Sequence, residues 1–360
     1  MLELKQNALV FTFPEVHPDA RLVVEFMRTL RIPDDDKTYP LPPGLGRFEM
    51  RHVDDLADRV PALWTRHGGV ALPMYPAEAM WLNFRSNFLA HHRSSYPFAL
   101  KIAAGKRSAV TGDPWHEGLQ RPGGLLRRPK QDYVVVPVQP WLDGFVVSKG
   151  LIRQFVAMEL GRGYSVEEQL TGEAEHGGLQ IEVVPMKREA FERHHPWREL
   201  PKPRAKGMRG TGGAPPMPAA PAAQAMRSSA APDMGLAAGG RMKQTIHTDP
   251  YALDDWQIDT RSRCFVHLAN ALVWQAITGS PPPQPPPTAA DYTRAGLPWF
   301  DHYSPVPAVD ADAKLASIRS VLDIATDRGE VALPENESTT PQRIVPTTPP
   351  SPDAVRDGEF

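Results

Sequence analysis

The chain has 360 residues, of which 41% are hydrophobic and 40 are prolines, so it suits two modest domains or one large one and excludes an all-helical fold. The formal net charge of −2 gives no support for specific nucleic-acid binding, and the single cysteine, Cys264, excludes an intramolecular disulfide. We find neither a secretory leader pattern nor a stretch of about 18 apolar residues, so we expect a cytoplasmic protein without a membrane span.

The N-terminal region, residues 1–200, is predicted to be a β-rich α+β unit. An alternating pattern indicates a strand over residues 22–32, and apolar stripes predict helices over 52–67 and 76–88. Residues 96–103 are predicted to be a strand that turns at Gly105-Lys106 and pairs with residues 108–111. The following loop, residues 113–118, is expected to be exposed.

Residues 131–186 are the densest run of strand-forming residues. Strands are predicted over 133–138, 145–147 and 151–158. Ser165 and Glu168 fit a capping box at the start of a short helix that Gly172 ends. Leu179, Ile181 and Val183 alternate with polar residues, which predicts a half-exposed strand.

One unit of this stretch has a counterpart later in the chain. Residues 153–156 (RQFV) correspond to 263–266 (RCFV), and 170–172 (LTG) correspond to 277–279 (ITG). Each copy is predicted to be a strand followed by a helix that ends at glycine. An internal duplication explains this similarity, but so does the general resemblance between strand–helix–glycine units, and both explanations stay open.

The remainder of the chain is predicted to divide into four parts. Residues 201–233 have the Pro/Ala/Gly-rich composition of a disordered linker, and 234–304 are expected to form a second strand–helix unit that packs on the first. Residues 305–333 contain an amphipathic helix, predicted over 312–326. Residues 334–360 are expected to be a disordered tail.

Apolar residues near the C-terminus are the candidates for partner binding. They are Trp299, Phe300, Leu315, Ile318 and Leu322. Because they follow a proline-rich spacer at 281–287, we interpret them as docking or self-association elements. Deletion of residues 305–360 is then expected to weaken partner recovery and to leave the fold intact.

A metal-dependent hydrolase is the alternative. His247 and Asp249 lie two residues apart at a predicted turn, and His267 lies in the next strand, so these side chains could hold a hydrolytic metal with an open position. His176 or His116 could add a ligand from the other half of the chain. The other interpretation is that they are ordinary loop and strand residues, and we prefer it. We therefore predict no cofactor, with a divalent metal as the alternative.

A carboxylate pair is the second candidate for catalysis. Asp143 follows Trp141, and Glu173 or Glu175 precedes a Gly-Gly turn, so Asp143 and one of these glutamates could share general acid–base work if the fold brought them together. Acidic residues at turns usually face water, however. We find no P-loop, no dinucleotide fingerprint, no H-E-x-x-H and no G-x-S-x-G.

Several short phrases resemble a family of bacterial and fungal hypothetical proteins. They are YPFALK at 96–101, QPWLD at 139–143, RQFVA at 153–157, GGLQ at 177–180 and LPWF at 297–300. The resemblance covers about residues 20–200 and 234–304. Because that family has no assigned activity, the resemblance implies no functional residue.

The sequence thus predicts a β-rich α+β fold with two packed sheet units and short helices. The absence of catalytic motifs, together with the appended apolar elements, favours a non-catalytic binding or scaffold protein. We expect a protein partner or self-association, no specific nucleic acid and no membrane.

Overall fold

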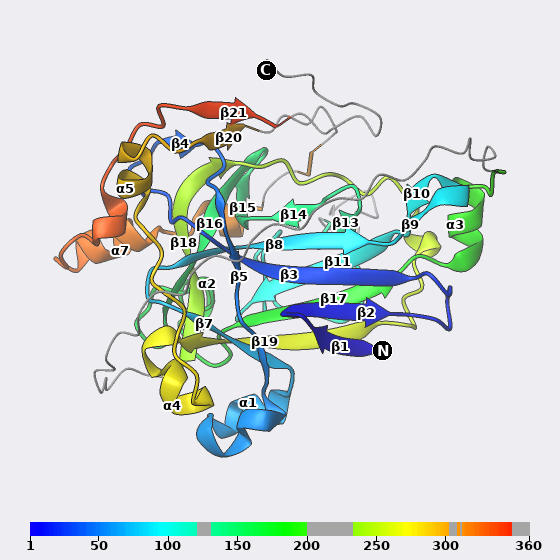
Figure 1. Cartoon of the computed structure of the whole chain (residues 1–360), viewed down its shortest axis with the longest axis horizontal. Helices are drawn as coiled ribbons and strands as arrows, with labels where there is room; N and C mark the ends of the chain where they lie inside the picture. The colour runs from blue at the N-terminus through cyan, green and yellow to red at the C-terminus, as the bar shows by residue number, and fades with distance from the viewer. Residues whose placement is uncertain (121–130, 200–232, 302–307, 310–311, 348–360) are drawn as a thin grey trace, which may run out of the picture.

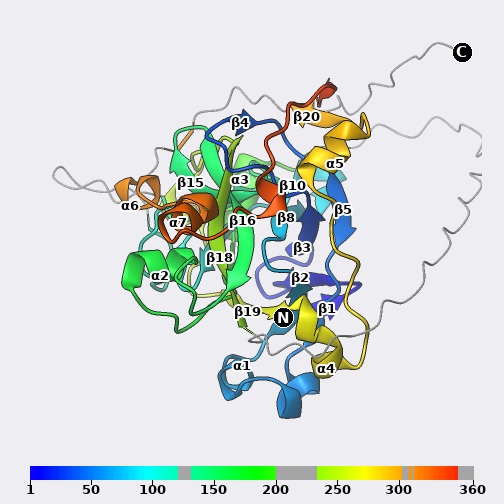
Figure 2. The ribbon, with the colours of Figure 1, turned by 90° about the vertical axis from the view of Figure 1, so that its left-hand side faces the viewer.

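The computed structural model describes residues 1–120, 131–199, 233–301, 308–309 and 312–347. It confirms the predicted class, because strands dominate and the helices are short (Figures 1 and 2). The predicted linker, except its last residue Asp233, lies outside the described residues, as does the end of the predicted tail from residue 348.

The first group of strands is β1 (Leu2–Lys5), β2 (Ala8–Thr12), β3 (Arg21–Thr29), β4 (Thr38–Tyr39), β5 (Gly44–Arg47), β6 (Arg51–His52), β7 (Val70–Met74), β8 (Ala79–Ser86), β9 (Phe88–Leu89), β10 (Ser94–Ser95) and β11 (Phe98–Ala104). The second group is β12 (Arg107–Ser108), β13 (Val134–Val136), β14 (Trp141–Leu142), β15 (Gly144–Ser148), β16 (Leu151–Glu159), β17 (Leu179–Pro185), β18 (Asp233–Lys243), β19 (Ser262–Asn270), β20 (Trp299–Asp301) and β21 (Ile344–Pro346). The helices are α1 (Ala62–His67), α2 (Val166–Thr171), α3 (Arg188–His194), α4 (Trp274–Thr278), α5 (Ala289–Arg294), α6 (Ala313–Ala316) and α7 (Val321–Asp327).

The main sheet forks at β19. One edge of β19 pairs with the parallel strand β7, whereas its other edge pairs first with β17 and then with β18. The first branch continues from β17 to β11 and β13. The second continues from β18 to β16, β8, β3, β2 and β1.

One large hydrophobic cluster takes side chains from both branches. Leu82 and Phe84 of β8 belong to it together with Phe98 and Leu100 of β11, and all four are buried. Phe13, which follows β2, lies 6.0 Å from Phe98 between ring centroids. The two branches are therefore two layers around a shared core.

The predicted capping box is confirmed. The Ser165 hydroxyl accepts a hydrogen bond from the Glu168 N–H at the start of α2, and the Glu168 carboxylate accepts one from the Ser165 N–H. α2 ends at Gly172, whose φ of 79° is left-handed and favours glycine. The predicted turn at Gly105-Lys106 is also confirmed, since β11 and β12 pair on either side of it.

The helix predicted over residues 76–88 is wrong, because this segment forms strand β8. Met80, Leu82 and Phe84 lie at every second position, so in a strand they share one face. Because β8 pairs with β3 and β16, this strand arrangement buries the apolar side chains. The helix predicted over 52–67 is in part correct. A 3₁₀ helix over Asp54–Arg59 and α1 occupy that range, and Pro61 separates them because it cannot continue a helix.

Strand β17 is fully buried, so the predicted half-exposed strand is wrong. β11 pairs with one edge of β17 and β19 with the other, and every residue of β17 is buried. Among them are Gln180 and Glu182, whose polarity gave the alternating pattern. On this central strand, polar residues are therefore buried side chains and do not indicate a solvent-facing side.

The two similar sequence units have the same local form. β16 leads to α2 and β19 leads to α4, and the helices end at Gly172 and Gly279 with φ values of 79° and 78°. The duplication itself stays a prediction. The second unit is continuous with the first, because β18 and β19 are hydrogen-bonded within the same sheet as β16 and β17.

The C-terminal helix predicted over 312–326 forms as two short helices. Asp312 caps α6 and Ser320 caps α7, because each side chain accepts a backbone N–H of the following turn. The tail predicted from residue 334 is wrong for residues 334–347, where β21 pairs with β20. Among the described helices, none has the length and apolar character needed to cross a membrane.

Candidate functional site

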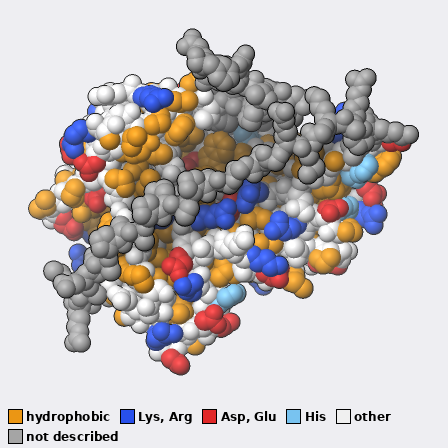
Figure 3. Space-filling model, in the orientation of Figure 1, with side chains coloured by type: hydrophobic (Ala, Val, Ile, Leu, Met, Phe, Trp, Pro, Cys, Tyr) orange, Lys and Arg blue, Asp and Glu red, His pale blue; other side chains and the backbone are white. Residues whose placement is uncertain are grey.

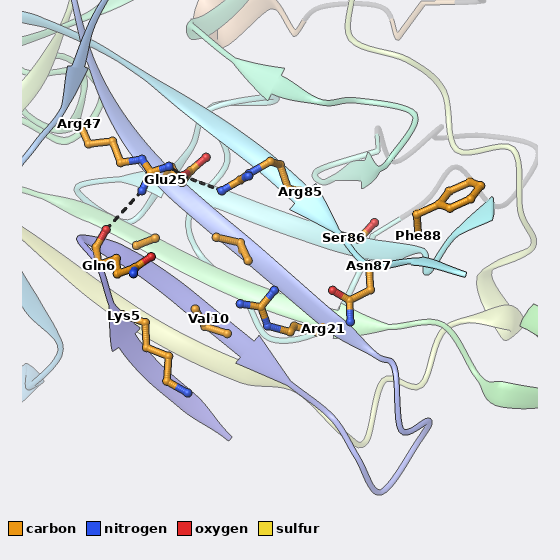
Figure 4. A pocket seen from close by; sticks show the side chains of 12 residues that line it. Lys5, Gln6, Val10, Arg21, Glu25, Arg47, Arg85, Ser86, Asn87 and Phe88 are labelled. Carbon is orange, nitrogen blue, oxygen red and sulfur yellow. Dashed lines mark hydrogen bonds and ion pairs between the residues drawn. The ribbon is translucent and has the colours of Figure 1, made fainter. Parts of the chain in front are cut away.

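A groove with a basic rim crosses the outer face of the second branch of the sheet (Figures 3 and 4). Its volume is about 720 Å³. The residues that line it come from β1, β2, β3, β5, β8 and β9 and from the turns beside them. They are Lys5, Gln6, Ala8, Val10, Arg21, Val23, Glu25, Arg47, Arg85, Ser86, Asn87 and Phe88. We call this feature the basic groove.

Strand register places these side chains on one face. Ala8 lies opposite Glu25, and Val10 lies opposite Val23, which in turn lies opposite Arg85. Because side chains alternate between the faces of a strand, the intervening residues, such as Leu9, point into the shared core. Ala8, Val10 and Val23 form a separate small apolar cluster. These short side chains are the floor between longer cationic ones.

A buried glutamate holds two of the arginines in place. Glu25 is 2% exposed, and its carboxylate accepts hydrogen bonds from the Arg85 Nη2 at 2.8 Å and the Asn83 Nδ2 at 2.7 Å. The Arg47 Nη2 lies 2.5 Å from the same carboxylate. Each guanidinium has five N–H donors, so both retain donors for a second anion. The Arg85 side chain is 58% exposed and accessible to such a ligand.

Arg21 has no side-chain hydrogen bond or ion pair with any described residue, although it lies on the same face. Lys5 pairs with Glu3 at 2.7 Å, but both side chains are solvent-exposed, so this pair is weak. The groove thus carries four cations and one carboxylate among its lining residues. This excess of positive charge creates a positive electrostatic potential that attracts carboxylates and other anions.

The Asp249 carboxylate, a predicted metal ligand, is used within the protein. It accepts hydrogen bonds from the Tyr133 hydroxyl at 2.6 Å, the Trp256 Nε1 at 2.9 Å and the Tyr251 N–H at 2.8 Å. These bonds tie the turn after β18 to β13. They give Asp249 a structural role in joining distant segments.

The two predicted metal-binding histidines are buried in different surroundings. The His247 backbone bonds to Gln139 and Gln131. The His267 ring stacks on Trp64 at 4.6 Å between centroids, and its Nε2 donates a hydrogen bond to the Gly68 carbonyl oxygen, 3.1 Å away. Burial lowers the pKa of His267 to about 3, so this ring is neutral at physiological pH. In the ranges that the structure describes, no three His, Cys, Asp or Glu side chains are grouped as a metal ion requires.

The two predicted catalytic carboxylates differ in environment. Asp143 is buried between β14 and β15 and accepts a hydrogen bond from the Gln244 Nε2 at 2.7 Å. Glu173 is exposed beyond the end of α2, in a shallow pocket that His176 also lines. No described contact joins the two acids, and Asp143 lines none of the described pockets.

Asp143 makes stability depend on pH. Burial raises the pKa of this carboxyl to about 7, so the folded state disfavours the charged form and loses stability as pH rises from about 4 to 7. Asp143→Asn should remove that loss and raise the free energy of unfolding at pH 8 by at least about 1.4 kcal/mol, the value of one pKa unit. Urea unfolding at pH 4.5 and pH 8 measures this difference. An equal effect of the substitution at both pH values would contradict the assignment.

The predicted partner-binding residues are mostly part of the protein's own core. Trp299 and Leu315 are fully buried, and Ile318 is 6% exposed. The Trp299 ring packs on Tyr39, and its Nε1 donates to the Thr293 hydroxyl at 3.1 Å. Phe300 and Leu322 are partly buried. The segment does dock, as its apolar character indicates, but onto this chain, which leaves little apolar surface for a partner.

A buried charged network lies on the other branch, and our reading of the sequence missed it. Lys101 of β11 donates to the carbonyl oxygens of His116 and Gly118, each at 2.6 Å, and its Nζ lies 3.0 Å from Asp132. The His116 Nε2 lies 2.8 Å from the same carboxylate. Residues 113–118, predicted to be an exposed loop, are therefore anchored to the sheet.

The residues of the basic groove were also missed, although the sequence holds a partial signal. Arg21 and Glu25 flank Val23 at alternate positions of a strand whose other side is apolar, which indicates an outer face with polar rims. Only the pairing of β1, β2, β3 and β8 brings Arg85 and Lys5 to that face. Comparison with protein-family models, with curated proteins and with solved structures gave no match, so geometry alone carries the functional argument.

Proposed function

We propose that this chain is a non-catalytic binding protein that holds an acidic segment of a protein partner in the basic groove. The supporting observation is Arg21, an arginine without a described partner, in the same groove as Arg47 and Arg85, which share a single carboxylate. Guanidinium groups bind carboxylates through two parallel N–H donors. The arginines of the groove therefore have more N–H donors than the described residues around them accept.

An acidic peptide fits this groove better than a single-stranded nucleic acid. Sequence-tolerant binding of bases requires several aromatic platforms in succession. Among the described residues that line the groove, Phe88 is the one aromatic side chain, and it lies at one end (Figure 4). The small apolar floor, Ala8, Val10 and Val23, suits instead the stems of glutamate side chains whose carboxylates reach the rim.

Binding to a peptide of six glutamates with a neutral fluorophore tests the proposal by fluorescence anisotropy. Arg21→Gln is the cleanest variant, because no described bond of the fold is lost. Arg21→Gln should weaken binding about fivefold, which corresponds to the loss of about 1 kcal/mol for one charge-assisted contact. Adding Lys5→Gln to this variant should weaken binding further. Binding should also weaken as salt rises from 50 to 200 mM.

Arg294→Gln is the matched control. Arg294 is exposed on α5 and pairs with Asp291, so this variant loses the same charge elsewhere on the surface. It should bind the peptide as the parent chain does. Equal weakening by Arg21→Gln and Arg294→Gln would mean that only net charge matters, and tighter binding of a single-stranded oligonucleotide of the same charge would favour a nucleic-acid ligand. Either result would contradict the proposal.

A further inference from the structure

An exposed aromatic surface adjoins the end of the basic groove. It consists of Phe88, His91 and Trp197, and we call it the aromatic corner. Phe88 is 66% exposed and Trp197 is 61% exposed. Figure 4 shows the Phe88 ring pointing away from the sheet at the end of the groove, beyond Ser86 and Asn87. Of the large hydrophobic side chains exposed in the described ranges, these two are the aromatic ones.

The backbone holds the aromatic corner in place. The 3₁₀ helix Ala90–His92 follows β9 directly, and its His91 carbonyl accepts a hydrogen bond from the Arg198 N–H at 2.7 Å. The His91 ring stacks on Trp197 with 5.0 Å between centroids and a 10° angle between planes. Figure 1 shows β9, β10 and α3 together at this end of the molecule. An aromatic ring that is already ordered loses little conformational entropy on binding.

The aromatic corner is continuous with the cationic rim. The Asn87 N–H donates to the Arg21 carbonyl at 3.2 Å, and Phe88 is the next residue. The Arg21 guanidinium, which has no side-chain partner among the described residues, and the exposed Phe88 ring thus come from two segments that this hydrogen bond joins. Aromatic and arginine side chains together dominate the binding energy of many protein interfaces.

We infer that the acidic partner segment carries an apolar anchor residue, within a few residues of its acidic side chains, that packs on Phe88 and extends toward Trp197. This inference rests on the proposed function and narrows it to a class of partner. The acidic residues bind the rim beside Arg21. The anchor is an aromatic or branched aliphatic side chain, which covers the Phe88 ring and so removes it from water.

Two peptides test the inference, one of six glutamates and one in which a phenylalanine follows the fourth glutamate. The second should bind the parent chain about fivefold more tightly, as burial of one aromatic pair gives about 1 kcal/mol. Phe88→Ala should abolish that advantage and change binding of the first peptide less than about twofold. Leu272→Ala, which removes another exposed apolar side chain, is the control and should change neither.

The outcomes separate the inference from the proposed function. If Phe88→Ala leaves the advantage of the phenylalanine peptide intact, or weakens both peptides equally, the anchor is overturned while the effect of Arg21→Gln stands. If Arg21→Gln has no effect on either peptide, the groove itself is overturned. The thermal unfolding temperature of Phe88→Ala should match that of the parent chain, since this side chain is mostly exposed. If Phe88→Ala loses much stability, the same peptide comparison is made with Trp197→Ala.

Discussion

Leu315→Ala should lower the free energy of unfolding by about 2–5 kcal/mol, the usual cost of truncating a buried leucine. Leu315 is fully buried and belongs to the large hydrophobic cluster, although α6, which carries it, is a single turn. Its side chain lies against the backbone of Gly112, where an added Cβ would come within 3.1 Å. Urea unfolding followed by tryptophan fluorescence measures the change.

The same packing changes the expectation for a C-terminal deletion. α7 contributes Val321, Ile324 and Ala325 to a second cluster that covers β16 and β18. Removing residues 305–360 therefore exposes core surface, and we now expect it to destabilise the fold. Val331→Ala is the matched control, because Val331 is 90% exposed, and it should change stability by less than about 0.5 kcal/mol. Cooperative unfolding at an unchanged urea concentration after the deletion would contradict this account.

Local patterns predicted the parts of the fold that depend on neighbouring residues. The capping box at Ser165, the glycine stop at Gly172 and the turn at Gly105 each need only a few consecutive residues to form. Residues 76–88 failed because their apolar residues fit a helical stripe and a strand alternation equally well. Pairing with β3 and β16, which are distant in the sequence, decides that this segment forms a strand and not a helix.

The candidate site could not be predicted by the same means. Lys5, Arg47 and Arg85 are separated by about forty residues at each step, and sheet register alone brings them to one face. The burial of the predicted docking residues could not be predicted for a related reason. An apolar stripe at Leu315 and Ile318 indicates that a surface will be covered, but it does not indicate whether the cover is another protein or the chain's own sheet.

Lys101→Met should lower the free energy of unfolding by about 3–5 kcal/mol, the cost of breaking a buried ion pair by removing one partner. The Lys101 side chain is 3% exposed and that of Asp132 is 2% exposed. Lys101 also donates to two carbonyl oxygens of the loop over residues 113–118, so the substitution removes a donor from both carbonyls and from the Asp132 carboxylate. Methionine has a similar shape, and the loss is therefore electrostatic and not a cavity.

The paired variant Lys101→Met/Asp132→Asn separates the charge from the packing. Neutralising Asp132 removes the buried carboxylate charge that has lost its lysine, so the double variant should be more stable than Lys101→Met alone by about 1–3 kcal/mol. Arg188→Met is the exposed counterpart: it breaks the Arg188–Glu192 pair on α3, whose side chains are solvent-exposed, and should cost much less stability than Lys101→Met. If Lys101→Met cost no more than Arg188→Met, the network would not hold the loop to the sheet. Because Trp115 lies 5.0 Å from the Lys101 Nζ, its fluorescence reports whether the loop leaves the sheet before the rest of the protein unfolds.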